Sequence, residues 1–198
     1  MIFEGNANQT INLKGQTLSN STEWNNYGIP FELGSVIIPD GVTLTLQPGS
    51  ELRMNSGVFI RINGTLIAEG ELENRIIFTA NTNEPSPGFW DKIEFQNDVN
   101  SRLINSDVLY SGEGAGASIE LNPSDVSITN VLIDYSGSDG IHVDDGSASH
   151  ILNTIITNSF EDGIFVDDSD SYITIENCTI NNSGFYPINM YADQYRNV

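Results

Sequence analysis

The sequence predicts an all-β protein in which short strands stack as the coils of a parallel β-helix. Three observations lead to this prediction. Helical signals are nearly absent, because no segment of the 198 residues holds a 3.6-residue apolar period for three turns. Short runs of alternating apolar and polar residues occur instead. In the second half of the chain, similar runs return at a nearly fixed interval.

Four short runs carry the strand signal. Each alternates apolar with polar residues, so that the apolar side chains lie on one face of an extended strand. Gly, Asn, Asp or Pro residues bound these runs, where the backbone is expected to turn. The runs cover residues 42–46, 58–62, 93–95 and 119–121.

Equivalent asparagines mark the repeat. Asn130, Asn153 and Asn177 follow one another at steps of 23 and 24 residues, each inside a run rich in Ile and Leu. In a β-helix each coil lies about 4.8 Å from the next, so residues at one repeat position become neighbours. We expect the three asparagines to form a ladder of side-chain amides at a bend. With roughly 23 residues per coil, the chain would hold about seven or eight coils in a rod about 35 Å long.

A single elongated domain is expected, because no linker or low-complexity run interrupts the pattern. Residues 1–34 are expected to form an N-terminal segment that caps the first coil, and residues 35–198 to form the coils. A cap is needed because the open end of a β-helix is an unpaired edge that invites association. A β-sandwich is the alternative fold, but its hairpins and its lack of a fixed period fit the sequence less well.

The charge is strongly acidic. Twenty-seven Asp and Glu residues stand against seven Lys and Arg residues, which gives a formal net charge of −20 at pH 7. Such a surface repels nucleic acid and anionic lipid and attracts cations or basic partners, so nucleic acid is not an expected partner. No apolar run approaches the length of about 20 residues that crosses a membrane, so membrane insertion is not expected either.

The single cysteine and the two ends of the sequence give information on disulfide bonding and on the cellular location of the protein. Cys178 has no partner for an internal disulfide and is expected to be a small buried core residue rather than a nucleophile. The first residues lack the basic flank and long apolar stretch of a signal peptide, and the sequence ends within its pattern. The chain is then either an intracellular protein or an excised piece of a longer, exported one. We expect the second, at the cell surface or outside the cell.

Two segments in the first half have a distinctive sequence. They are residues 36–49, which read VIIPDGVTLTLQPG, and residues 62–70, which read INGTLIAEG. Residues 87–90 then read Pro-Gly-Phe-Trp before the next strand. This order resembles the β-helix regions of large bacterial and archaeal cell-surface proteins, which have the pectin-lyase-like fold. The resemblance implies a right-handed parallel β-helix, found beside adhesion, carbohydrate-binding and polysaccharide-degrading modules.

One repeat position is expected to form an outward column. His142 and Phe165 each stand between two apolar residues that point inward, so their own side chains point outward. Glu120 and Asn189 hold the equivalent position one coil before and one coil after, and Tyr191 adds an aromatic ring. Polar groups beside exposed rings suit a sugar, because an aromatic face covers apolar C–H groups. This pattern predicts a glycan-binding strip, unless the rings pack under loops.

Acidic turns on neighbouring coils predict a cation site. Carboxylates about 5 Å apart repel by roughly 1 kcal/mol in water and by several kcal/mol at an effective dielectric constant near 20. A hard cation with oxygen ligands would offset this repulsion, which makes calcium the expected ion. The alternative is that the carboxylates point into water. The residues are Asp144, Asp145, Asp167, Asp168 and Asp170.

An enzymatic interpretation is the alternative to a binding module. Residues 138–141 (Ser-Asp-Gly-Ile) and 161–164 (Glu-Asp-Gly-Ile) are similar, in order and spacing, to the first two motifs of polygalacturonase-like glycoside hydrolases. The resemblance implies a general acid and a general base drawn from Asp139, Glu161 and Asp162. The histidine that these enzymes carry one coil later and their Arg-x-Lys motif are both missing, which puts hydrolysis in doubt.

The sequence therefore predicts a noncatalytic extracellular module of a surface protein, for adhesion, carbohydrate binding or structural spacing. Its expected partner is a polysaccharide or a cell-surface glycan, and bound calcium is an additional expectation. Two alternatives remain open at this point. The chain could be part of a polysaccharide hydrolase or lyase that acts on an acidic glycan, or it could be a purely architectural stalk.

Overall fold

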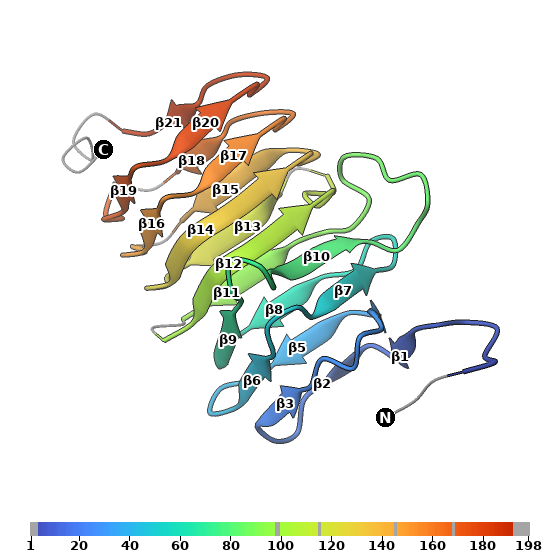
Figure 1. The fold of residues 1–198 in the computed structure, drawn as a ribbon. Helices are drawn as coiled ribbons and strands as arrows, with labels where there is room; N and C mark the ends of the chain where they lie inside the picture. Colours follow the sequence, from blue (N-terminus) through green and yellow to red (C-terminus); the bar gives the residue numbers. More distant parts are fainter. Residues whose placement is uncertain (1–3, 98–99, 115, 145, 168, 192–198) are drawn as a thin grey trace.

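The computed structural model describes residues 4–97, 100–114, 116–144, 146–167 and 169–191, which form 21 short strands and no helix. The strands pair in parallel from each coil to the next and build an elongated stack with β1 and β21 near opposite ends (Figure 1). The predicted parallel β-helix is confirmed. Within the described residues, no helix is long and apolar enough to cross a membrane.

One side of the coils is an eight-stranded parallel sheet. In spatial order it contains β2 (Gln16–Thr17), β5 (Val36–Ile38), β8 (Ile60–Ile62), β11 (Ile93–Gln96), β13 (Ala117–Asn122), β15 (Asp139–Val143), β18 (Ile164–Val166) and β21 (Ile188–Asn189). Each coil contributes one strand to this sheet, which agrees with the seven or eight coils expected.

The other two sides belong to a 13-stranded sheet that is bent into two rows. The first row contains β3 (Thr22–Trp24), β6 (Thr43–Leu46), β9 (Thr65–Glu69), β16 (His150–Leu152) and β19 (Thr174–Glu176). The second row contains β1 (Ile11–Leu13), β4 (Phe31–Leu33), β7 (Glu51–Met54), β10 (Ile76–Ala80), β17 (Ile155–Thr157) and β20 (Thr179–Asn181). The long strands β12 (Arg102–Leu109) and β14 (Ser127–Asp134) turn from the first row into the second.

Asparagine makes the bend between the two rows. Asn130, Asn153 and Asn177 all lie at this bend with φ between +51° and +54°, as does Asn105 with φ of +47°. Asparagine tolerates this left-handed conformation better than most residues do. The Asn130 Nδ2 atom donates a 2.6 Å hydrogen bond to Asn105 Oδ1, and Asn105 donates to Gly70 O at 2.7 Å. The predicted bend is therefore confirmed, and it extends one coil further towards the N-terminus. The amide–amide hydrogen bond joins Asn130 to Asn105, so the ladder through Asn153 and Asn177 stays a prediction.

A second left-handed bend joins the second row to the eight-stranded sheet. Tyr110 and Tyr135 have φ of +64° and +57°, and Asn158 and Asn182 have +54° in the following coils. A bulky residue with positive φ is uncommon. The two tyrosine rings stack with centroids 5.2 Å apart and planes 4° apart, and Asn182 donates to Asn158 Oδ1 at 3.2 Å. Side-chain stacking from coil to coil thus supports the strained backbone.

The core consists of apolar columns that run along the stack. In the eight-stranded sheet, Ile62, Phe95, Leu121 and Val143 occupy successive positions and are all fully buried. Burial of each such side chain contributes roughly 1.5–3 kcal/mol. The expected inward stacks of Ile, Val and Leu are therefore present in successive coils.

The two ends of the stack differ from its middle. Strands β1, β2 and β3 pair with β4, β5 and β6, so residues 11–24 form a first coil on which the next one lies. The division expected at residue 34 stays a prediction. Near the other end, Cys178 is only half-buried and packs against the core, where its Sγ lies 3.4 Å from Ile151 O. Burial raises the pKa of this thiol, which disfavours the nucleophilic thiolate.

Candidate functional site

The expected outward column lies along the eight-stranded sheet. Glu120 of β13 pairs in register with His142 of β15, His142 with Phe165 of β18, and Phe165 with Asn189 of β21. Each of the four side chains is partly exposed, whereas both neighbours of His142 in β15 are fully buried. Tyr191 follows β21 and is 52% exposed. We call the column of Glu120, His142, Phe165 and Asn189 the strip.

Two ion pairs continue the strip towards the N-terminus. Arg61 of β8 pairs in register with Glu94 of β11, and Glu94 pairs with Glu120. The Arg61 Nε atom lies 2.7 Å from Glu94 Oε2, and Lys92 Nζ lies 2.8 Å from Glu120 Oε1. The Glu94 side chain is only 7% exposed, so its pair with Arg61 is weakly screened by water. Sequence reasoning missed Arg61, Lys92 and Glu94.

The surroundings of Lys92 are acidic. Burial raises the pKa of Asp91, Lys92 opposes the effect, and Glu120, Glu113 and Glu94 add to it by repulsion. One ammonium group therefore faces several carboxyls. The field over this end of the strip favours a neutral or cationic ligand over an anionic one.

The centre of the strip is a histidine beside an aromatic ring. The centroids of the His142 and Phe165 rings lie 4.9 Å apart with planes tilted by 50°. His142 Nδ1 lies 3.9 Å from Asp139 Oδ2. Its Nε2 atom is covered and hydrogen bonds to no residue in the described part of the chain. A buried polar atom without a hydrogen bond lowers the stability of the fold, so a hydrogen-bond partner for this nitrogen would be favourable.

Asp139 and Asp162 support the backbone of the coil that follows each of them. Asp139 Oδ1 accepts a 2.8 Å hydrogen bond from the Asp162 backbone N–H, and Asp162 Oδ1 accepts one of 2.8 Å from Tyr186 N–H. Asp162 Oδ2 also accepts from Asn189 Nδ2 at 2.8 Å, which ties Asp162 to the strip. Both aspartates are 5% exposed. Each carboxylate therefore has a structural role, which the sequence reasoning did not anticipate.

The pKa of the Asp139 carboxyl lies in the range that suits a general acid. Burial raises the pKa of its carboxyl from 3.8 to about 6, while the hydrogen bond from the Asp162 backbone and the nearby His142 oppose the rise. Asp162 and Glu161 add to the rise by repulsion. Glu161 is partly exposed and accepts a 2.9 Å hydrogen bond from Ser138 Oγ. The structure thus brings the three candidate acids together, although the two aspartates are nearly inaccessible.

The acidic turns lie at equivalent places in successive coils. Asp144 follows β15 and Asp167 follows β18, and their backbone N–H groups donate to Leu121 O and Val143 O at 2.9 and 3.0 Å. Asp167 and Asp170 are exposed. Asp145 and Asp168 lie outside the described residues. Within the described ranges, no group of three or more His, Cys, Asp or Glu side chains is arranged to hold a metal. The calcium site therefore stays a prediction.

Comparisons with known proteins identify the fold. A family model described as "Right handed beta helix region" matches residues 2–192. The match spans β1 to β21, and its description gives the coil a right-handed sense. No curated protein and no solved structure matches the chain.

Proposed function

The chain belongs to the right-handed β-helix region family, and we propose that it is a noncatalytic module of an exported surface protein that binds a glycan on its strip. The observation that carries this proposal is the register that aligns Glu120, His142, Phe165 and Asn189 along four coils. A glycan chain lying along the axis of the stack would contact one outward side chain in each coil, about 4.8 Å apart.

The chemistry of the strip supports a sugar ligand. The Phe165 ring offers an apolar face for sugar C–H groups, Asn189 offers a polar group beside it, and Glu120 offers a carboxylate on the far side of His142. A sugar hydroxyl above the strip would give His142 Nε2 the partner that it lacks among the described residues.

The charge supports a neutral polysaccharide. The formal net charge of −20 repels polyanions over the whole surface. Two cations continue the strip towards the N-terminus, and both already pair with a carboxylate: Arg61 with Glu94, and Lys92 with Glu120. Recognition would then rest on hydrogen bonds and ring stacking, which depend little on salt.

Binding measurements with single variants test the proposal. Phe165→Ala and His142→Ala each remove one side chain from the strip, and both side chains point away from the core. Leu152→Ala is the matched control, because Leu152 is a partly exposed apolar residue on β16, in the first row. Each protein is titrated with the neutral polysaccharides that the unaltered chain binds.

The expected result is that each strip variant loses about tenfold in affinity, or about 1.4 kcal/mol, while the control binds normally. If Phe165→Ala and His142→Ala bind as tightly as the control Leu152→Ala, the proposed site is wrong. Absence of binding to any glycan would contradict the proposed function and favour a structural stalk.

A second candidate function is general-acid catalysis on a polysaccharide, and the raised pKa of Asp139 is the observation that favours it. A carboxyl with a pKa of about 6 is well suited to donate a proton near neutral pH. Against this, Asp139 is 5% exposed, and a substrate oxygen would have to reach hydrogen-bonding distance of it. Release of reducing sugar that is lost in Glu161→Gln and Asp139→Asn would establish this function.

A further inference from the structure

A polar groove lies on a different side of the coil from the strip. Residues of β7 and β10 in the second row and of the long loop 81–92 line it. Figure 1 shows where these two strands and this loop lie in the stack. The volume of the groove is about 510 Å³, within the range of about 300–1,000 Å³ for small-molecule sites. The lining residues are Glu51, Arg53, Thr79, Ala80, Asn81, Thr82, Asn83 and Pro85.

Both ends of the loop are fixed to the coils. At its start, Asn81 Nδ2 donates to Asn55 Oδ1 at 2.9 Å, and Asn55 Nδ2 donates to Leu33 O at 3.2 Å in the preceding coil. Near its end, Trp90 is fully buried and its Nε1 donates to Leu109 O at 2.8 Å. The two ends of the loop are therefore fixed before a ligand arrives, which lowers the cost of ordering the residues between them.

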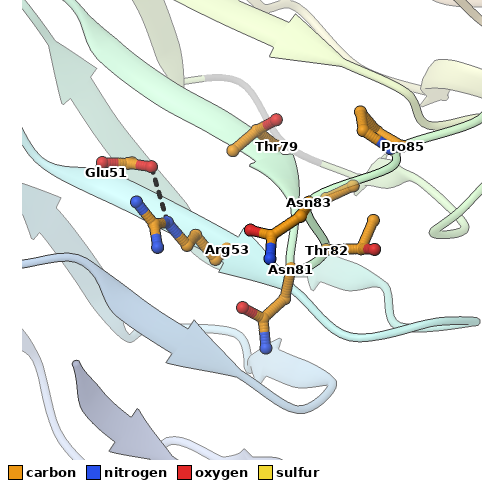
Figure 2. Close-up of a pocket in the computed structure, with 8 residues that line it drawn as sticks. Glu51, Arg53, Thr79, Asn81, Thr82, Asn83 and Pro85 are labelled. Carbon is orange, nitrogen blue, oxygen red and sulfur yellow. Dashed lines mark hydrogen bonds and ion pairs between the residues drawn. The ribbon is translucent and has the colours of Figure 1, made fainter. Parts of the chain in front are cut away.

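The groove presents hydrogen-bond donors beside acceptors. Arg53 Nε donates to Glu51 Oε1 at 2.7 Å, and the two side chains are 39% and 32% exposed. The Nη atoms of Arg53 make no hydrogen bond to any residue that the structure describes. In Figure 2 the side chain of Asn83 points from the loop back towards Arg53, and Thr79 stands on the neighbouring strand.

We propose that this groove is a second saccharide-binding site, which takes one or two sugar units of a neutral glycan. A sugar hydroxyl both donates and accepts, so adjacent hydroxyls can accept from Arg53 and donate to Glu51. The Asn83 amide would hold a further hydroxyl, and Pro85 would cover apolar C–H groups. An anion is disfavoured because Glu51 already neutralises Arg53, and Glu32 lies in register beside Arg53.

The proposal goes beyond the function assigned to the strip and does not depend on it. The strip belongs to the eight-stranded sheet and the groove to the second row, so the two sites face different directions around the coil. A module with both sites would bridge two glycan chains rather than follow one. Multivalent attachment of this kind raises the overall avidity without any new contact.

The test uses side-chain amide signals in nuclear magnetic resonance spectra of the ¹⁵N-labelled protein. The probes are cellotetraose, xylotetraose, mannotetraose and maltotetraose, each added up to about 10 mM, which detects millimolar binding. Asn81 and Asn83 carry amide groups inside the groove, so their signals report binding there. The ring signals of His142 and Phe165 report the strip separately.

Arg53→Ala and Asn83→Ala are the test variants. Arg53 points outward from β7 and Asn83 is exposed on the loop, so neither substitution removes core packing. Arg102→Ala is the matched control, because Arg102 also pairs with a glutamate, Glu69 at 3.2 Å, but on the first row. Amide spectra of each variant verify the fold.

We expect at least one tetrasaccharide to shift the Asn81 and Asn83 signals. Arg53→Ala should weaken that binding by about tenfold, through the loss of a charge-assisted hydrogen bond, and Arg102→Ala should leave it unchanged. Asn83→Ala should weaken it as well. Unshifted Asn81 and Asn83 signals with every probe, or equal affinity of Arg53→Ala, would overturn the groove proposal whatever happens at the strip.

Discussion

Replacement of Asp139 by asparagine should make the protein more stable at neutral pH. Asp139 is 5% exposed, and its Oδ1 atom accepts a hydrogen bond from the Asp162 backbone. The asparagine side chain of the variant would have the same shape, and its carbonyl oxygen could accept the same bond. The substitution therefore removes the buried charge and keeps the support that Asp139 gives to the next coil.

The magnitude follows from the pKa of Asp139. Burial raises that pKa from 3.8 to about 6, so between these values the folded chain binds more protons than the unfolded chain does. Stability therefore falls as pH rises through this window, and the whole penalty is present above pH 6. A pKa difference of about two units corresponds to about 3 kcal/mol in the free energy of unfolding, which is an upper limit.

Urea unfolding at about pH 4 and about pH 7.5 measures the effect. Asp139→Asn should unfold at higher urea concentration than the unaltered protein at the higher pH, and at a similar concentration at the lower pH. Asp167→Asn is the control, because it removes one charge from an exposed position, and it should change stability by less than about 0.5 kcal/mol. A destabilised Asp139→Asn protein at both pH values would refute the reasoning.

Three further predictions concern the core, the bend and the acidic turns. Phe95→Ala should lower the free energy of unfolding by about 3–5 kcal/mol in urea titrations, because Phe95 is fully buried between Ile62 and Leu121. Asn130→Ala should lower the melting temperature more than Asn130→Gly does, because only glycine adopts the φ of +54° freely. Calcium at about 1 mM should raise the melting temperature relative to EDTA if the acidic turns bind it, and identical melting curves would rule this out.

The regular repeat made the second half of the chain predictable. Steps of 23 and 24 residues place Asn130, Asn153 and Asn177 at one bend, and the same steps align His142 with Phe165. A period of this kind fixes register, because each coil must lie on the one before it. The strip could therefore be assembled from the sequence alone.

The register of the first half could not be predicted in the same way, because the connections between its strands differ in length. Loop 81–92 lengthens one coil, so Arg61 and its partner Glu94 are 33 residues apart in the sequence. A search at 23 residues misses such a pair. The groove depends on this same loop and could not be foreseen, because a loop of this length has no repeat partner to place it.

The roles of Asp139 and Asp162 could not be read from the sequence either. Two aspartates one coil apart suggest repulsion or a shared cation. In the structure, each instead accepts a hydrogen bond from the backbone of the following coil. Only the direction of the side chain separates these cases, and a repeat pattern does not specify that direction. The bend at Tyr110 and Tyr135 was missed for a different reason. Tyrosine rarely adopts a positive φ, so its presence in a sequence does not indicate a bend.

The central claim is that the chain binds a glycan on its strip without cleaving it. The most direct test measures binding to a glycan array, with and without calcium, beside release of reducing sugar from the same glycans. We predict binding to at least one neutral polysaccharide, lost in Phe165→Ala, with no sugar released. Release of sugar would contradict the claim and make Asp139, Glu161 and Asp162 the residues to substitute next. Absence of both binding and release would also contradict it and would favour a structural spacer.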